Sequence, residues 1–512
     1  MSSRLSILSP KAASARHVRR APHAPGSPLV VLILILTCQL MIILDASVVI
    51  TALPKIHESL HFSATGLSWV QNAYTLTFGG LLLLGARAGD ILGRRRVFVA
   101  GIAVFTLASL MGGLAQSASW LLIARAVQGT AAAVAAPSTL ALLMMTFTNG
   151  RERARAVGLY SSVSGAGSSV GLVVGGLLTN ALSWRWGLFI NVPIGIALVA
   201  LAPRFLPETE PRPGRFDLTG AVTSTLGMTA IVYAFVRAAS DGWADRGTIA
   251  SFVSGAALLG AFVLTEMRAE HPITPLRLFA DRSRGGSYLA RLLILGGMFS
   301  FFFFITQYLQ GVRDYSPLKA GFAFLPMTAL MFTMVQVVPK LSRRFSSVQL
   351  MAGGVGLAVT GMTWLSRLDA QTQYFPQIAL PMVLLGSGIG VALIPLTGAS
   401  IEGVEERDAG AASGLVNVAQ QIGAAVGLAV MVTIFGAASR AAAHHPLAGV
   451  TAQASAQHNL AHAVGSALTG SAAFLAVAFT VIVLLVRRRP TSPVALQQEP
   501  ETVMAYATSD AA

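Results

Sequence analysis

Long runs of apolar residues recur along the whole chain, and short polar segments separate them. Each run is close to the roughly 20 residues that a helix needs to cross the hydrocarbon core of a bilayer. The pattern predicts an all-α integral membrane protein. Its fourteen membrane-spanning helices are expected at residues 28–50, 66–86, 97–116, 120–146, 156–179, 186–203, 216–237, 248–267, 286–309, 318–338, 348–366, 376–396, 410–436 and 466–486.

The composition supports this fold class and excludes others. Of 512 residues, 54% are hydrophobic and 11% are charged, whereas a soluble domain carries about 25% charged residues. A soluble enzyme, a disulfide scaffold and a disordered protein are therefore excluded. The one cysteine, Cys38, can form neither an intrachain disulfide nor a metal cluster. Without a Walker sequence, an HExxH motif or a paired nucleophile and base, we expect no ATP, metal, cofactor or enzymatic activity.

The basic residues predict the orientation of the chain. The net charge is +15, but the basic residues form short clusters between apolar runs, which argues against nucleic-acid binding. With the N-terminus placed inside, 26 basic residues fall on the inner side and eight on the outer side. Basic residues are retained on the cytoplasmic side, so both termini are expected there. The excess of arginine over lysine suggests a bacterial host, and hence the inner membrane.

Two charged linkers divide the spans into six, two and six. The first lies between residues 203 and 215, and the second between 268 and 285. Short basic loops follow the second span of each group of six, as expected of repeated halves in a secondary transporter. The predicted organisation is a tail (1–27), a six-helix bundle (28–203), a linker with two extra helices (204–285), a second six-helix bundle (286–486) and a second tail (487–512).

Two opposite charges are expected to meet inside the membrane. Asp45 in the first span and Arg125 in the fourth lie at similar depth when about 1.5 Å is counted per residue. Ionisable residues are expensive in hydrocarbon and are functional candidates by default. A carboxyl beside a fixed cation can change protonation state with its surroundings, so we expect this pair to couple transport to protons. A static ion pair is the alternative, and Arg291 is expected to reach the headgroups.

Several uncharged polar residues also lie within spans, where they could line a wet substrate cavity. Interhelical hydrogen bonding is the alternative for each of them. Asn417, Gln420 and Gln421 share one helix face by their spacing. The complete candidate set is Gln71, Asn72, Tyr74, Gln128, Gln307, Gln310, Asn417, Gln420 and Gln421.

Glycines recur at four-residue spacing in the fifth span, at Gly167, Gly171 and Gly175. Such a face allows another helix to approach closely. It predicts a packing seam that could also slide during gating. A cytoplasmic latch is expected in the basic loop after the second span, at Arg87, Asp90, Gly93, Arg94 and Arg95.

The chain resembles the major facilitator superfamily, and in particular its fourteen-helix drug:proton antiporter family. The resemblance covers about residues 28–486. It rests on Asp90 with Gly93-Arg94-Arg95, on Arg125 with Gln128-Gly129, and on five further segments. These segments are Leu44 to Val49 with Ala52-Leu53-Pro54, Trp69 to Leu76, Trp184-Arg185-Trp186, Asn191 to Gly195, and Tyr315 to Gly321.

The resemblance implies two six-helix bundles with two extra helices, and a proton-coupled exporter of amphipathic small molecules such as drugs and antibiotics. It also suggests that the Asp90 loop acts as a gate. The depth and charge of the buried pair predict that Asp45 carries the coupling proton and that Arg125 tunes it. Gly171-Leu172 stands where the family's antiporter signature has Gly-Pro, which leaves the direction of transport open. A proton-coupled uptake symporter and a non-transporting membrane sensor are therefore retained as alternatives. The substrate is not specified by the sequence, and a monomer is expected.

Overall fold

The structure, a computed structural model, describes residues 27–211, 216–269, 274–405, 408–443 and 451–486. Within these ranges the regular structure is helical and no strand occurs. The first seven α-helices are α1 (Pro28–Leu60), α2 (Trp69–Leu92), α3 (Arg94–Gly113), α4 (Ala118–Thr146), α5 (Gly150–Ala181), α6 (Trp186–Phe189) and α7 (Asn191–Phe205). The others are α8 (Leu218–Asp241), α9 (Arg246–Arg268), α10 (Arg282–Gly311), α11 (Pro317–Ala323), α12 (Leu325–Leu341), α13 (Ser347–Leu365), α14 (Ala379–Ile401), α15 (Ala409–Ala443) and α16 (Ala452–Leu485). Two short 3₁₀ helices are η1 (Gly66–Ser68) and η2 (Leu276–Phe279).

The described residues contain fourteen helical segments long and apolar enough to cross a membrane, which confirms the predicted number of spans. Three of these segments combine two elements: η1 with α2, α6 with α7, and α11 with α12. Helices α1 and α16 are longer than the predicted spans, because α1 continues to Leu60 and α16 begins at Ala452. The alanine-rich stretch predicted as a loop before the last span is helical from Ala452 onward, as the helix propensity of alanine favours.

Polar side chains at the helix ends define where several spans begin. Asp245 caps α9 by accepting a hydrogen bond from the backbone N–H of Thr248, and Ser316 caps α11 through Lys319. Ser346 and Gln349 form a capping box at α13. Each cap satisfies a backbone N–H that the helix leaves unpaired, so these residues end the loops and fix the start of the next span.

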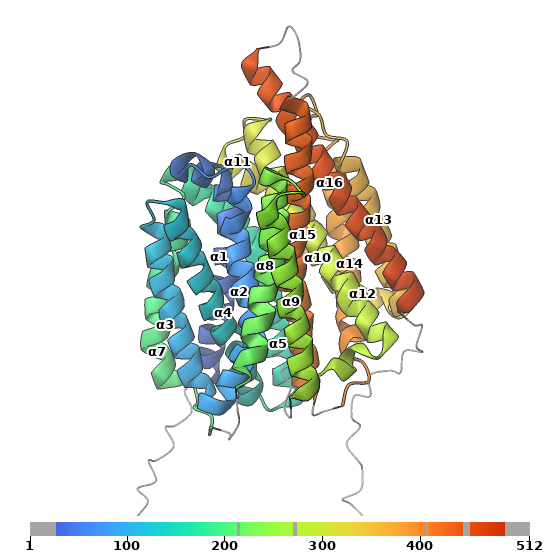
Figure 1. The fold of residues 1–512 in the computed structure, drawn as a ribbon. Helices are drawn as coiled ribbons and strands as arrows, with labels where there is room; N and C mark the ends of the chain where they lie inside the picture. Colours follow the sequence, from blue (N-terminus) through green and yellow to red (C-terminus); the bar gives the residue numbers. More distant parts are fainter. Residues whose placement is uncertain (1–26, 212–215, 270–273, 406–407, 444–450, 487–512) are drawn as a thin grey trace, which may run out of the picture.

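The helices stand roughly side by side in one bundle (Figure 1). Because the number of spans is even, α1 begins and α16 ends at the same side of the molecule, here called the terminal side. The opposite side is called the distal side. Helix α8 packs against both α2 and α15, and α9 packs mainly against α8. The two extra helices therefore lie beside the junction of the two halves; the exact domain boundaries stay a prediction.

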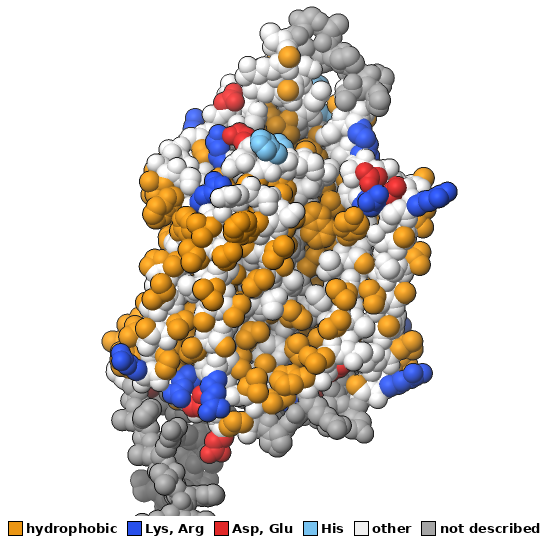
Figure 2. Space-filling model, turned by 60° about the vertical axis from the view of Figure 1, so that its left-hand side comes forward, with side chains coloured by type: hydrophobic (Ala, Val, Ile, Leu, Met, Phe, Trp, Pro, Cys, Tyr) orange, Lys and Arg blue, Asp and Glu red, His pale blue; other side chains and the backbone are white. Residues whose placement is uncertain are grey.

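The outer surface is that of a protein surrounded by lipid. Hydrophobic side chains cover the middle of the face in Figure 2, whereas Lys and Arg gather toward its upper and lower edges. Helix α9 illustrates the same point, because only 11% of its most apolar window is buried within the molecule. Its exposed residues include Val253, Leu264 and Met267. Such a surface has a favourable environment only in a bilayer.

The two halves touch closely at the distal side. A Cβ atom added at Gly176 of α5 would lie 2.5 Å from the carbonyl oxygen of Pro317 at the start of α11. Likewise, a Cβ at Gly321 would lie 2.6 Å from the carbonyl oxygen of Leu172. Gln310 Nε2 on α10 donates a hydrogen bond of 2.9 Å to the carbonyl oxygen of Thr51 on α1. These contacts close the distal end of the junction between α5 and α11.

Candidate functional site

The carboxylate of Asp45 lies at the centre of a buried polar cluster. Its Oδ2 atom is 2.6 Å from Nη1 of Arg125 on α4, and both side chains have no exposed surface. Its Oδ1 atom accepts hydrogen bonds of 2.8 Å from Gln128 Nε2 and from Asn191 Nδ2. Two helices besides α1 therefore supply donors to a single carboxylate: α4 through Arg125 and Gln128, and α7 through Asn191.

Arg125 is held by more than its carboxylate partner. Its Nη1 atom also donates to Gln128 Oε1 at 3.1 Å, and its Nε atom donates to the carbonyl oxygen of Val70 at 3.2 Å. The guanidinium lies 4.5 Å from the ring centre of Tyr74 on α2, a cation–π arrangement that favours a charged group away from water. A buried charge requires this kind of compensation, so the network explains how Arg125 is tolerated within a span.

Ser109 of α3 closes the cluster on its remaining side. Its hydroxyl oxygen accepts hydrogen bonds from Gln128 Nε2 at 2.6 Å and from Asn191 Nδ2 at 3.0 Å. Neither Ser109 nor Asn191 was predicted as a site residue. Asn191 belongs to a segment that the sequence already marks by its family resemblance, whereas nothing in the sequence distinguishes Ser109 from other serines within spans.

The cluster combines one fixed cation with one carboxylate that can bind a proton. Protonation of Asp45 would leave Arg125 with neutral partners only, and deprotonation restores the pair. Five buried polar side-chain atoms around the pair have no partner: Arg125 Nη2, Tyr74 Oη, Asn191 Oδ1 and both ends of the Asn72 amide. The amide of Gln71 is also without a partner.

The predicted cavity residues of the N-terminal half are buried in this conformation. Gln71, Asn72, Tyr74 and Gln128 have exposures of 4, 0, 2 and 0%. Gln128 bonds to the Asp45 carboxylate, and Tyr74 packs on Arg125. These residues surround the charged pair; their contact with a substrate stays a prediction for a conformation that opens this region.

The predicted cavity residues of the C-terminal half occupy different positions. Gln310 joins α10 to α1, as described above, and Gln307 is partly buried with an unpaired Nε2 atom. Asn417 is exposed, and Gln421 packs against Gly79 of α2. Gln420 Oε1 lies 3.5 Å from Arg291 Nη2. The structure thus does not gather them into one site, and their role in binding stays a prediction.

The expectation for Arg291 is wrong. Its side chain is only 8% exposed and points into the C-terminal half, where its Nη1 atom donates to Thr397 Oγ1 of α14 at 2.8 Å. Counting residues from the helix end gives depth but does not tell which face of the helix a side chain occupies. That face is turned toward α14 and α15 instead of lipid headgroups.

The basic loop after α2 is tied to the segment that follows α7. Asp90 and Arg94 form an ion pair of 2.5 Å. The backbone N–H of Arg94 donates to Thr209 Oγ1 at 2.8 Å, and Glu208 lies 3.4 Å from Nε of Arg95. Gly93 has φ of 98°, a conformation that favours glycine. Arg87 is partly buried. These contacts join the loop to the start of the predicted linker, and a gating role for the loop stays a prediction.

The glycine face of α5 packs directly on α1. Added Cβ atoms at Gly167 and Gly175 would meet Ile43 and Val48 at 3.2 and 2.7 Å, and one at Gly171 would overlap the Ser47 hydroxyl. The close approach that the spacing predicts is therefore present, whereas sliding along this seam stays a prediction.

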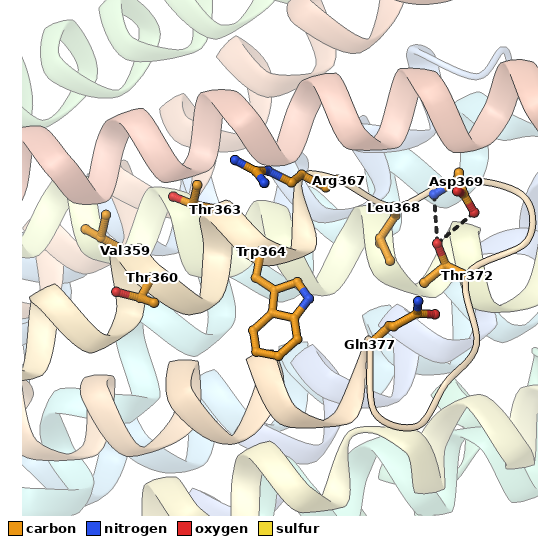
Figure 3. Close-up of a pocket in the computed structure, with 9 residues that line it drawn as sticks. All are labelled: Val359, Thr360, Thr363, Trp364, Arg367, Leu368, Asp369, Thr372 and Gln377. Carbon is orange, nitrogen blue, oxygen red and sulfur yellow. Dashed lines mark hydrogen bonds between the residues drawn. The ribbon is translucent and has the colours of Figure 1, made fainter.

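One surface hollow lies away from the predicted residues. It has a volume of about 610 Å³ and is formed by the distal end of α13 and the loop to α14. Trp364, Arg367 and Gln377 line it (Figure 3), together with Asp369 and Thr372, which are hydrogen-bonded to each other. The Thr372 hydroxyl donates to the Asp369 carboxylate at 2.8 Å and lowers its pKa. None of the predicted site residues lines this hollow, so it does not define the candidate site.

Fourteen spans in two halves, with a buried ion pair in one half, define a membrane transporter of the secondary type. A profile of the Major Facilitator Superfamily matches residues 35–428. The chain belongs to this superfamily, and it is a multi-pass membrane transporter of small molecules, not an enzyme.

Its relatives include named resistance and export proteins. The puromycin resistance protein pur8 of Streptomyces alboniger is 43% identical over 76% of this chain and 78% of its own length. The cephamycin export protein CmcT of Amycolatopsis lactamdurans is 40% identical over 76% of this chain and 81% of its own length. A bacterial homologue of the human lysosomal transporter Spinster has the same fold, with a TM-score of 0.63, 16% identity, and coverage of 91% of this chain and 99% of that one.

Proposed function

We propose that this protein is a proton-coupled exporter of amphipathic small molecules, including antibiotics, and that it works by alternating access in the inner membrane. Two relatives, at 43% and 40% identity, are named for puromycin resistance and cephamycin export, which supports export as the direction. In this proposal both termini are cytoplasmic, so the terminal side faces the cytoplasm. The protein acts as a monomer without ATP or a cofactor.

The observation that carries the proton coupling is the burial of Asp45 in a closed set of donors. Arg125, Gln128 and Asn191 all bond to its carboxylate, which has no exposed surface. All three donors bond to the charged carboxylate, so each of these bonds is weakened when Asp45 binds a proton. A movement of α4 or α7 away from α1 would therefore load a proton on Asp45, and the return would release it.

Coupling could in principle arise from direct competition between proton and substrate at Asp45. In this conformation the carboxylate is sealed from the surroundings, so substrate cannot touch it directly. The proposed coupling therefore acts through helix movement. Protonation weakens the bonds between α1, α4 and α7, and the altered packing favours the conformation that accepts or releases substrate.

The test uses inverted membrane vesicles that contain the wild type or Asp45→Asn. In inverted vesicles an exporter carries radiolabelled puromycin into the lumen when the lumen is made acidic. We expect wild-type accumulation, and loss of the gradient-driven part in Asp45→Asn. Asp217→Asn is the matched control, since Asp217 caps α8 through Gly220 and asparagine caps equally well.

The outcome also separates the alternatives. A proton-coupled symporter would carry puromycin out of acidified vesicles, and a non-transporting sensor would bind it without any dependence on the gradient. If Asp45→Asn accumulates puromycin uphill at the wild-type rate, the coupling proton is not carried by Asp45.

A further inference from the structure

Arg291 is a buried cation for which the described residues provide no carboxylate partner. It lies on α10, nine residues after Arg282 begins the helix, which places it about 13 Å into the span. Its side chain is 8% exposed. Arginine keeps its charge under all physiological conditions, and the described ion pairs do not include it. It differs in this respect from Arg125, whose charge is balanced by Asp45.

The contacts of Arg291 hold it in place without neutralising it. Nη1 donates to the Thr397 hydroxyl at 2.8 Å, and Nη2 lies at 3.5 Å from the amide oxygen of Gln420. The Nε atom is buried and has no partner. Nε and Nη2 form one edge of the guanidinium. Among the described residues, that edge has one hydrogen-bond partner, the distant Gln420, whereas Nη1 is bonded to Thr397 of α14.

The corresponding edge of another arginine in this molecule, Arg277, binds a carboxylate. Arg277 donates from Nε to Asp408 Oδ2 at 2.8 Å and from Nη2 to Asp408 Oδ1 at 2.7 Å. This paired arrangement is the preferred geometry of arginine with a planar oxyanion. At Arg291 the same two donors are present, and no carboxylate among the described residues accepts from them.

Polar groups of the N-terminal half occur at a comparable depth. Tyr160 of α5 donates to Gln39 Oε1 of α1 at 2.7 Å, and Gln39 Nε2 donates to Ser164 at 3.0 Å. Tyr160 lies ten residues from the start of its helix, or about 15 Å. These side chains are partly buried. Both halves thus carry polar side chains at one level of the bundle, and the unbalanced charge is in the C-terminal half.

We propose that Arg291 recognises an oxyanion, so that the protein prefers amphipathic substrates that carry a carboxylate or phosphate group. This edge is buried in the present conformation, so the oxyanion binds in a conformation of the transport cycle that opens it. There the Nε and Nη2 atoms donate to the two oxygens, and Thr397 orients the guanidinium. This inference rests on the proposed function, because it names a substrate class for that exporter. A lipid headgroup phosphate presents the same chemistry as a soluble amphiphile, and the experiment separates the two sources.

The experiment measures binding to the purified full-length protein in phosphatidylcholine nanodiscs. The two probes are dansylphenylalanine and its methyl ester, which differ in the carboxylate charge. We expect the wild type to bind the acid at least about tenfold more tightly than the ester, which corresponds to about 1.4 kcal/mol. Arg291→Gln should bring the ratio of the two dissociation constants to about one, while Arg343→Gln, which removes an exposed cation, should leave it unchanged.

A second pair of variants keeps the arginine and therefore does not depend on how Arg291→Gln folds. Thr397→Asp places a carboxylate beside the guanidinium and should abolish the preference for the acid. Thr397→Asn has nearly the same shape without the charge and should retain it. Addition of phosphatidylglycerol to the nanodiscs identifies the source. If a headgroup phosphate is the natural anion, this lipid weakens acid binding in the wild type but not in Arg291→Gln.

The proposal is overturned if the wild type binds acid and ester equally or binds neither, or if Arg291→Gln or Thr397→Asp keeps the wild-type ratio. These results concern binding without a pH gradient. They can therefore fail while puromycin export in vesicles succeeds, and a loss of gradient-driven export in vesicles leaves the binding ratio unaffected.

Discussion

At the scale of single residues, the arrangement of hydrogen bonds around Arg125 requires a guanidinium specifically. One nitrogen donates to Asp45 and Gln128, and another donates to the backbone of Val70. A lysine has one charged nitrogen at the end of a flexible chain and cannot serve both positions. The residue therefore fixes the relative positions of α1, α2 and α4 as well as balancing a charge.

We predict that Arg125→Lys lowers the rate of gradient-driven transport by at least about tenfold, because charge-assisted hydrogen bonds contribute about 1.5–3 kcal/mol each. The measurement is puromycin accumulation in inverted vesicles at equal protein content. Arg185→Lys is the control, since Arg185 needs only to reach the Ala115 carbonyl oxygen and the Trp184 ring. Wild-type transport by Arg125→Lys would show that a planar guanidinium with donors at two positions is not required.

The sequence predicted the charged pair but not its surroundings. Asp45 and Arg125 are recognisable because charges within apolar runs are rare, and depth can be counted from the helix ends. Ser109 and Asn191 are neutral, and the sequence does not show that α3 and α7 turn them toward α1. The prediction for Arg291 was wrong for the same reason, because the depth of a residue does not determine which face of the helix its side chain occupies. Side-chain direction depends on helix packing, which the hydropathy pattern does not contain.

At the scale of elements, α5 carries two different glycine contacts. Gly167, Gly171 and Gly175 face α1 within the N-terminal half, whereas Gly176 faces Pro317 of α11 across the two halves. The sequence spacing predicted the first face. It could not reveal the second, because a single glycine beside a repeated motif carries no periodic signal. Alternating access requires the second contact to separate, since it closes the distal end of the junction.

We predict that Gly176→Ala slows transport severalfold by preventing full closure of the distal seam. The added Cβ atom would lie 2.5 Å from a backbone oxygen, so the two helices must move apart. Gly158→Ala is on the same helix with nothing within 4 Å. It receives the same gain in helix propensity, up to about 1 kcal/mol, and should transport normally. Equal transport rates for the two variants would contradict the seam's role.

The turn between α8 and α9 is held by a different kind of contact. Arg237 Nε donates to Asp245 Oδ2 at 2.7 Å and lowers the pKa of that carboxyl to about 2. Because the pKa is lowered in the folded protein, the contribution to stability is present above the ordinary value near 4 and is lost only as the pH falls toward 2. This turn is therefore insensitive to the pH range over which a proton-coupled transporter works.

At the scale of the whole molecule, hydropathy was sufficient to predict the number of spans, because the bilayer imposes both length and composition on each helix. The orientation is a prediction from the arginine distribution. The arrangement of α8 and α9 beside both halves needed the structure, since neither linker sequence specifies which face of the bundle the extra helices cover.

We predict the orientation as follows. In a Cys38→Ala background, cysteines introduced at Ser240 and Gln371 on the distal side should react in intact cells with a membrane-impermeant maleimide. A cysteine at Ser342 on the terminal side should react only after permeabilisation. All three positions are exposed, so access depends on the side of the membrane. Reaction at Ser342 alone in intact cells would reverse the orientation.

The attachment of α8 has a mechanical consequence. Its hydrogen bonds lead to α15, where Thr433 donates to the Phe235 carbonyl oxygen at 2.7 Å and Arg440 donates to that of Ala239. Toward α2, the Thr225 side chain of α8 lies close against Gly80. An apolar cavity of about 180 Å³ lies where α2, α8 and α15 meet. If the two halves rotate against each other during transport, α8 and α9 should move together with the C-terminal half. The two moving units then contain six and eight spans. Because the units differ in size, the same force between them should rotate the smaller unit through the larger angle in the membrane.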